Sequence, residues 1–262
     1  MQRHPGDGGW AADAGEGLFG AMAMVAALAT PMLQGRRSHW GLTEEEEATP
    51  RPGDALVPTP RWSWTHAVEV DAPASDTWPW VIQIGQGRAG FYSYQALENL
   101  VGCEVVNADH VLPDAQEVHL GDPFRLHPDM PPLRVQVLVP GRAVVVGGRI
   151  DLATGGPAPD RETAPQGTPT TEPSRLFACS WAFLVEPLSD DRCRVVSRFR
   201  VTHPDDLGSR LAYGAGLLEP IGFVMDRRML LGIKERVEAA RPAGQDAPSS
   251  GTTLPNPIHD AL

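Results

Sequence analysis

The stretch VIQIGQGRAGFYSYQALENL, residues 81–100, constrains the fold most, because it is compatible with two very different architectures. Gly85, Gly87 and Gly90 match the G-x-G-x-x-G pattern of dinucleotide-binding βαβ units, and Asp109 follows where a ribose-binding acid would stand. In such a unit the glycine turn opens a helix that leads to a second parallel strand. The residues on either side therefore decide between a nucleotide-binding sheet and another fold.

The flanking sequence argues against nucleotide binding. The preceding run WPWVIQI continues from a helix-start pattern and contains Pro79, and proline is unfavourable in a central strand. The four residues FYSY after Gly90 delay the next helix, so no helix N-terminus faces a pyrophosphate there. We interpret the glycines as turn residues and predict that the chain needs no cofactor.

The remaining pattern predicts an α+β protein. Residues 62–72 alternate as a strand does, and two short helices follow, the second in SYQALENLVG. GDPFRLHP and LRVQVLVPGRAVVVGG are typical of strands with a tight turn at 140–141, and CSWAFLVEPL and CRVVSRFRVT are typical of a hairpin joined at 189–191. Strands that follow one another through tight turns indicate an antiparallel sheet.

Helical periodicity returns from Asp206 to about Ala240, and we expect Pro220 to kink or divide this last helix. Three segments lack periodicity and have little to bury. We expect residues 1–17 and 241–262 to be disordered and the Gly/Pro/Thr-rich insertion 151–174 to be a mobile loop.

The apolar segment LFGAMAMVAALATPML, residues 18–33, has two interpretations. It is shorter than the roughly 20 residues that span a bilayer as a helix, and acidic rather than basic residues precede it. A helix over 18–38 that packs on the domain or on a partner is one interpretation. A membrane-contacting helix is the other.

Charge and cysteine usage narrow the partners and the compartment. The formal net charge of −11 argues against nucleic acid, which needs a basic face. Three widely spaced cysteines without C-x-x-C fit reduced thiols in a cytoplasmic protein, with membrane association as the alternative. His110, His119 and His127 are too far apart for a local metal motif, so no metal site is predicted.

Residues 71–122, DAPASDTWPWVIQIGQGRAGFYSYQALENLVGCEVVNADHVLPDAQEVHLGD, resemble bacterial START-like proteins of the SRPBCC superfamily. The resemblance extends from WGLTEEE to EPIGFVMDRRMLLGIKERVE, so the predicted START-like domain is residues 39–240. It implies the helix-grip fold, an antiparallel sheet wrapped around a long C-terminal helix with two short helices after the first strand. It also implies a pocket for an apolar small molecule or lipid between sheet and helix.

The candidate ligand-binding residues are Gln83, Gln86, Arg88, Tyr92, Tyr94, Glu98, Asn99, Trp181, Arg198, Arg200, Met225 and Met229. Tyr94 and Glu98, one helical turn apart, are the catalytic candidates, since they could polarise a carbonyl and move a proton. Each candidate also has a purely structural interpretation. Arg88 could pair with Glu98, and the two tyrosines could pack in the core. Arg198 and Arg200 could face solvent on the exterior of the sheet. The methionines are either core filler or a pocket wall.

Three functions remain open at this point. Binding of a small hydrophobic or amphipathic molecule in the pocket is the leading hypothesis. A polyketide-cyclase- or dehydratase-like enzyme acting in the same pocket is the second. A membrane-associated lipid-sensing or interaction protein, with residues 18–33 on a lipid surface or a partner, is the third.

Overall fold

An antiparallel sheet and a long C-terminal helix form the centre of the molecule. The computed structural model of the chain describes residues 9–158 and 175–241. The strands are β1 (Trp62–Val70), β2 (Pro123–Phe124), β3 (Leu133–Val139), β4 (Ala143–Asp151), β5 (Gly156–Pro157), β6 (Leu176–Pro187) and β7 (Cys193–Thr202). The helices are α1 (Gly9–Ala29), α2 (Gln34–Arg37), α3 (Glu44–Ala48), α4 (Ala74–Ile82), α5 (Gln95–Leu100), α6 (Leu207–Tyr213) and α7 (Leu218–Ala239), with short 3-10 turns at Pro31–Leu33, Asp54–Leu56 and Pro113–Ala115.

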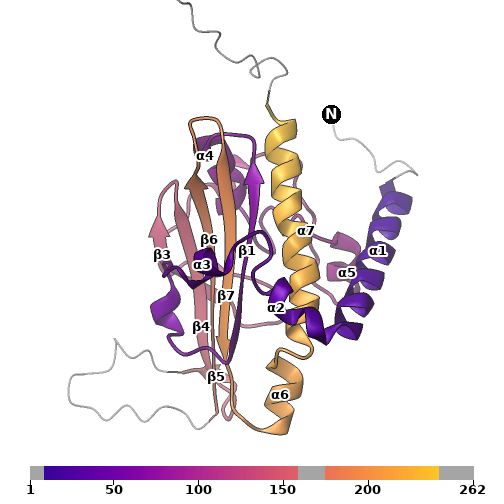
Figure 1. Cartoon of the computed structure of the whole chain (residues 1–262), viewed down its shortest axis with the longest axis vertical. Helices are drawn as coiled ribbons and strands as arrows, with labels where there is room; N and C mark the ends of the chain where they lie inside the picture. The colour runs from indigo at the N-terminus through magenta and orange to yellow at the C-terminus, as the bar shows by residue number, and fades with distance from the viewer. Residues whose placement is uncertain (1–8, 159–174, 242–262) are drawn as a thin grey trace, which may run out of the picture.

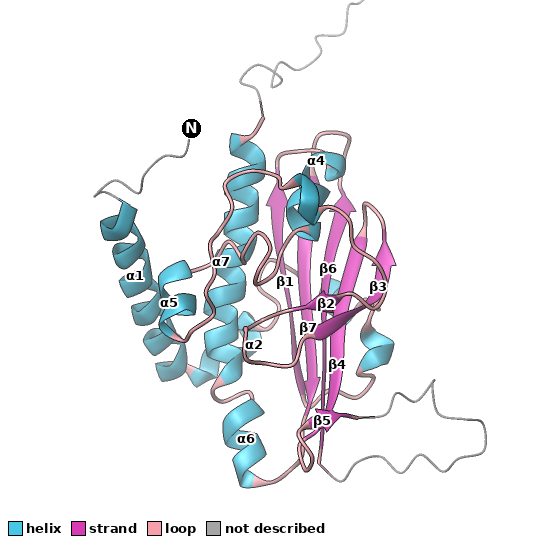
Figure 2. Cartoon of the chain, turned by 180° about the vertical axis from the view of Figure 1, so that it is seen from behind, coloured by secondary structure: helices cyan, strands magenta, loops and turns pink. Residues whose placement is uncertain are grey.

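The strands pair in the order β1-β7-β6-β4-β3-β2, with β5 on β4, and every pair is antiparallel. Helix α7 lies along one face of the sheet, and α1 lies on the other side of α7 (Figure 1 and Figure 2). Residues 43–57, which include α3, cover part of the opposite face, where Arg194 pairs with Glu46 and Arg198 pairs with Asp54. The predicted α+β, helix-grip fold is therefore confirmed.

Alternation along β7 explains how one strand serves both faces, because successive side chains of a strand point in opposite directions. Ser197 points towards α7, where its hydroxyl donates to Asp226. Arg198, its neighbour, points to the opposite face and donates to Asp54. The sheet thus has a helix-covered inner face and an outer face on which charged residues surround a smaller apolar cluster that includes Val145, Leu184 and Val196.

The glycine-rich stretch forms a turn, as predicted. Residues 74–82 before it are helical, and Gly85 and Gly90 pair with each other through two backbone hydrogen bonds of 2.9 and 3.1 Å. Gly90 has a φ of +76°, and a Cβ there would lie 2.5 Å from the side-chain oxygen of Asn107. The glycines therefore close a compact loop between α4 and α5 rather than opening a nucleotide-binding helix.

Two predictions about the ends of the chain need correction. Helix α1 begins at Gly9, so residues 9–17 are helical rather than disordered, and the helix stops at Ala29 instead of continuing to residue 38. The last helix divides at residues 214–217, before Pro220. That proline lies in the first turn of α7, where its missing N–H has no intrahelical partner to lose. The beginning of the expected loop 151–174 is also corrected, because Asp151 belongs to β4 and Gly156–Pro157 form β5 against it. Residues 159–174 and nearly all of the expected tail 241–262 lie outside the described residues.

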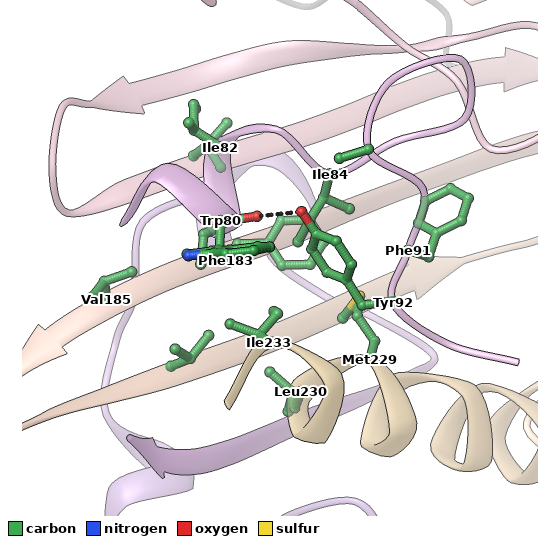
Figure 3. Packing of buried hydrophobic residues seen from close by; sticks show 14 of the residues in the cluster. Trp80, Ile82, Ile84, Phe91, Tyr92, Phe183, Val185, Met229, Leu230 and Ile233 are labelled. Carbon is green, nitrogen blue, oxygen red and sulfur yellow. Dashed lines mark hydrogen bonds between the residues drawn. The ribbon is translucent and has the colours of Figure 1, made fainter. Parts of the chain in front are cut away.

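The main core lies between the sheet and the C-terminal half of α7. Figure 3 shows Trp80 from α4, Tyr92 from the glycine-rich loop and Phe183 from β6 packed towards Met229 and Ile233 of α7. Their near-complete burial supplies much of the hydrophobic stabilisation of this end of the molecule. Between the sheet and the N-terminal half of α7, side chains fill the space less completely.

Helix α1 packs closely on the domain and yet exposes apolar side chains. Gly17 and Gly20 let it approach α5, where Ala96 and Tyr94 lie against them. The exposed large apolar residues around it are Leu18, Phe19, Met22, Val25, Leu28, Met32 and Leu33. Among the described helices none is long and apolar enough to cross a bilayer singly, whereas residues 13–29 of α1 and residues 31–37 pass that test only as a pair bent by 89°. Membrane contact through residues 18–33 stays a prediction.

Candidate ligand-binding cavity

A cavity of about 240 Å³ opens between the sheet and the N-terminal half of α7. The sheet contributes its floor, α7 one side, and the segment from the glycine-rich loop through α5 the other. Its lining residues are Trp64, Phe91, Ser93, Glu98, Cys103, Leu126, Trp181, Phe199, Gly222, Met225, Asp226 and Met229. The lining is therefore largely aromatic and aliphatic, with a few polar groups, which is the usual composition of a small-molecule site.

Aromatic rings from three adjacent strands form the floor. Trp64 of β1 stacks on Phe199 of β7 with ring centroids 4.7 Å apart, and Trp181 of β6 meets Phe199 edge to face at 6.3 Å. The register pairs these strands so that all three rings share the inner face. Gly222 of α7 lies opposite Trp64, and a Cβ there would come within 2.5 Å of the indole. Glycine at this position thus makes room for the indole under α7.

Glu98 is the least compensated polar group in the cavity wall. It lies on α5, is only 7% exposed, and its Oε2 has no hydrogen-bond partner within the described chain. Burial without a compensating charge penalises the ionised form, and it raises the pKa of Glu98 to about 7. The carboxyl group can therefore exist in either protonation state near neutral pH.

Asp226, the second carboxylate in the wall, has partners for both oxygens. Its Oδ1 accepts from the Ser197 hydroxyl at 2.6 Å, and its Oδ2 lies 2.5 Å from Nδ1 of His66. Ser197 in turn accepts from the indole N–H of Trp181 at 2.9 Å. This chain of contacts ties β1, β6 and β7 to α7 beneath the cavity. Asp226 thus has a partner within the protein for each of its two oxygens, whereas Oε2 of Glu98 has none among the described residues.

Three further polar groups border the cavity. The Ser93 hydroxyl donates to the backbone carbonyl of Met225 at 3.2 Å, which links the loop wall to α7. Burial, and secondarily the charge of Glu98, raises the pKa of the Cys103 thiol, so this cysteine is a poor thiolate. The indole N–H of Trp64 is buried and has no acceptor within the described residues. It is a second uncompensated polar group among the residues that line the cavity.

Several sequence-predicted residues build the loop wall instead of lining the cavity. The Gln83 amide donates to the Tyr92 hydroxyl at 2.6 Å and accepts from the backbone N–H of Leu112 at 2.8 Å. Arg88 donates to the carbonyls of Ile82 and Ala115, so the alternative Arg88–Glu98 pair does not form. Asn99 bonds both backbone groups of Val105. Gln86 is half-buried in the same loop and does not line the cavity.

The two catalytic candidates separate. Glu98 lines the cavity, but Tyr94, the N-cap residue of α5, packs with Ala27 of α1 and Val224 of α7. Tyr94 lies instead in a groove of about 560 Å³ between α1, residues 30–40 and α7. A joint role of the two side chains on one carbonyl is therefore not supported by their placement.

Arg198 and Arg200 lie on the outer face of the sheet. Arg198 pairs with Asp54, and Arg200 donates to the carbonyls of Val57 and Pro58. Neither arginine reaches the cavity, because strand alternation sends both side chains away from α7. The prediction that Arg198 and Arg200 bind a ligand in this cavity is therefore wrong, whereas Trp181, Met225 and Met229 do line the cavity.

The sequence interpretation missed eight lining residues, namely Trp64, Phe91, Ser93, Cys103, Leu126, Phe199, Gly222 and Asp226. One signal was available for Asp226, an acid between Val224 and Met229 on the apolar face of the last helix. Within residues 9–158 and 175–241, no group of three or more His, Cys, Asp or Glu side chains is arranged to hold a metal ion.

No family model and no curated protein matches the chain. Among solved structures it is similar to a protein from Nitrosospira multiformis, 10% identical over 69% of this chain and 100% of that one, with a TM-score of 0.37. It is also similar to an Arthrobacter aurescens protein, 15% identical over 74% and 91%, with a TM-score of 0.34. A third is norcoclaurine synthase from Thalictrum flavum in complex with dopamine and hydroxybenzaldehyde, 15% identical over 74% and 96%, with a TM-score of 0.33.

With TM-scores of 0.33 to 0.37, these similarities carry no argument about the function of this chain. The sheet order and the helix across the sheet define the fold, and the cavity between them is the candidate site.

Proposed function

We propose that the chain binds a small hydrophobic or amphipathic molecule in the cavity between the sheet and α7. The observation that carries this proposal is the cavity itself, about 240 Å³ in volume and walled mainly by aromatic, leucine and methionine side chains. An apolar cavity of about 150 Å³ is enough to bind benzene. The space under α7 therefore suits a molecule somewhat larger than a single six-membered ring.

Native mass spectrometry of the freshly purified chain, compared with its denatured mass, tests this proposal. We expect a discrete excess mass that denaturation removes. Leu126→Trp supplies the control, since Leu126 lies in the cavity wall on a loop and a larger ring there fills the space. A wild-type chain without excess mass, whose Trp64 and Trp181 indole signals also fail to shift in NMR spectra when toluene is added, would refute the proposal.

A second candidate function is proton transfer to or from a bound carbonyl compound, as in cyclase- or dehydratase-like enzymes. The observation that favours it is Glu98, whose pKa of about 7 suits a general acid or base at neutral pH. Solvent-deuterium exchange next to the carbonyl of acetophenone, followed by NMR, provides the assay. Glu98→Gln should abolish exchange and Tyr94→Phe should leave it unchanged, because only Glu98 faces the cavity. Equal exchange in wild type and Glu98→Gln would exclude this candidate.

A further inference from the structure

The charged side chains that line the cavity are all acidic, and this excess of negative charge affects which ligands the cavity can bind. Two carboxylates, Glu98 and Asp226, belong to its lining, and no arginine, lysine or histidine does among the described residues. Two histidines contact residues in or beside the cavity wall without lining the cavity themselves. Nδ1 of His66 lies 2.5 Å from Oδ2 of Asp226, and Nε2 of His127 lies 3.0 Å from the carbonyl oxygen of Val101. An anionic ligand entering this space would therefore meet negative charge without a partner cation.

The two carboxylates are not equivalent. Both oxygens of Asp226 are occupied by Ser197 and His66, so it has little left to offer a ligand. Glu98 is more than nine-tenths buried, and the described residues provide neither an ion pair nor a hydrogen bond for its Oε2. A buried ionised carboxylate without a partner is costly, and a ligand that supplies the partner recovers that cost on binding.

The remaining walls suit the same ligand. The rings of Trp64, Trp181 and Phe199 line the same space. Trp64 is stacked on both His66 and Phe199, with ring centroids 5.4 and 4.7 Å apart, so these rings supply a rigid apolar floor for the body of a ligand. The methylene and ring portions of a ligand would be buried against Met225 and Met229.

We infer that the cavity selects an organic cation, an amine carried on an apolar body of about one ring, whose ammonium group pairs with the carboxylate of Glu98. This inference rests on the proposed function, because it names the ligand class for the same cavity. The ammonium group donates its N–H bonds to the unpartnered oxygen, and the apolar body fills the space between the aromatic floor and α7.

Three probes of nearly the same shape separate this inference from the proposed function: benzylamine, benzyl alcohol and benzoate. Each is titrated at pH 8 in about 0.15 M salt, which screens weak binding to the acidic surface, and the indole N–H signals of Trp64 and Trp181 report binding. We expect benzylamine to bind at least tenfold more tightly than benzyl alcohol, and benzoate most weakly. Glu98→Gln should bring benzylamine to the level of benzyl alcohol, and Leu126→Trp should remove both.

A pH series on the wild-type chain tests the same inference without any substitution. The amine pairs with ionised Glu98, which loses its charge as the pH falls through about 7. The titratable neighbours are Cys103 on the loop after α5, which is neutral in this range, Asp226 on α7 with its partner His66 on β1, and His127 on the segment beside Val101. We expect benzylamine affinity to fall about tenfold between pH 8 and pH 6, and benzyl alcohol affinity to stay constant.

The outcomes are distinguishable. Equal affinities of benzylamine and benzyl alcohol in the wild type would overturn the inference and leave the proposed function standing. A preference for benzylamine that survives Glu98→Gln, or that does not change with pH, would place the cation elsewhere and also overturn it. Failure of all three probes to shift either indole signal would contradict the proposed function as well.

Discussion

Replacing Glu98 with glutamine should stabilise the folded chain at neutral and alkaline pH. The carboxyl group is nine-tenths buried in an apolar wall, and its pKa rises from an ordinary value of 4.5 to about 7 because burial penalises the ionised form. Each pH unit between the folded and unfolded pKa is worth about 1.4 kcal/mol. Ionised Glu98 therefore costs about 3 kcal/mol of folding free energy once the pH exceeds 7.

The sign of the pH dependence follows from this raised pKa. The folded state holds the proton of Glu98 between pH 4.5 and 7, whereas the unfolded state has already released it. The stability of the wild type therefore falls across this window relative to Glu98→Gln, and the difference is constant above it. Urea unfolding of both chains at pH 5, 6, 7 and 8 measures the difference directly.

Glu117→Gln is the matched control for this series. Its side chain is 83% exposed and pairs, among the described residues, only with the exposed His119, so the same substitution there should change the unfolding free energy by less than about 1 kcal/mol at every pH of the series. Parallel stability curves for the wild type and Glu98→Gln between pH 5 and 8 would refute the reasoning. They would mean that Glu98 is solvated or paired in solution and is not an uncompensated group.

Three further predictions concern the framework around the cavity. Arg37→Met should lower the free energy of unfolding by about 3–5 kcal/mol in urea titrations, because it leaves Glu219 buried without its partner, and adding Glu219→Met should restore most of the loss. Gly90→Ala should cost at least about 1–2 kcal/mol because of its left-handed φ and crowded Cβ position, whereas Gly87→Ala, also left-handed but with open space around it, should cost less in the same titrations. Asp226→Asn should cost about 1.5–3 kcal/mol, measured by thermal unfolding, because it weakens two buried hydrogen bonds to a charged group.

Local patterns were sufficient to predict most of the fold. The strand expected from the alternation in residues 62–72 is present as Trp62–Val70, and the tight turn at 140–141 is present as well. These features depend on interactions within a few residues, so they can be read from neighbouring side chains. The sequence pattern predicts a break in the last helix at Pro220, but the structure has the break at residues 214–217, which include Gly214 and Gly216. Proline is tolerated in the first turn of a helix, so Pro220 does not interrupt α7.

The site was harder to predict because its residues meet only through tertiary structure. Tyr94 and Glu98 are one turn apart in sequence, but α1 covers Tyr94, and nothing in residues 91–100 signals where α1 will lie. Trp181, Ser197 and Asp226 form one hydrogen-bonded chain across two strands and a helix, and the register that brings them together is set by the whole sheet. Gln83 and Asn99 look like ligand contacts by residue type, yet loop backbone groups engage them.

Intermolecular nuclear Overhauser effects between bound toluene and the protein test the central claim most directly, since they report which side chains surround the ligand. The account predicts contacts from toluene protons to the methyl groups of Met225 and Met229 and to the indoles of Trp64 and Trp181. Contacts confined to exposed residues of α1, such as Phe19 and Met22, with none to the methionines of α7, would show that the space between the sheet and α7 is not the binding site.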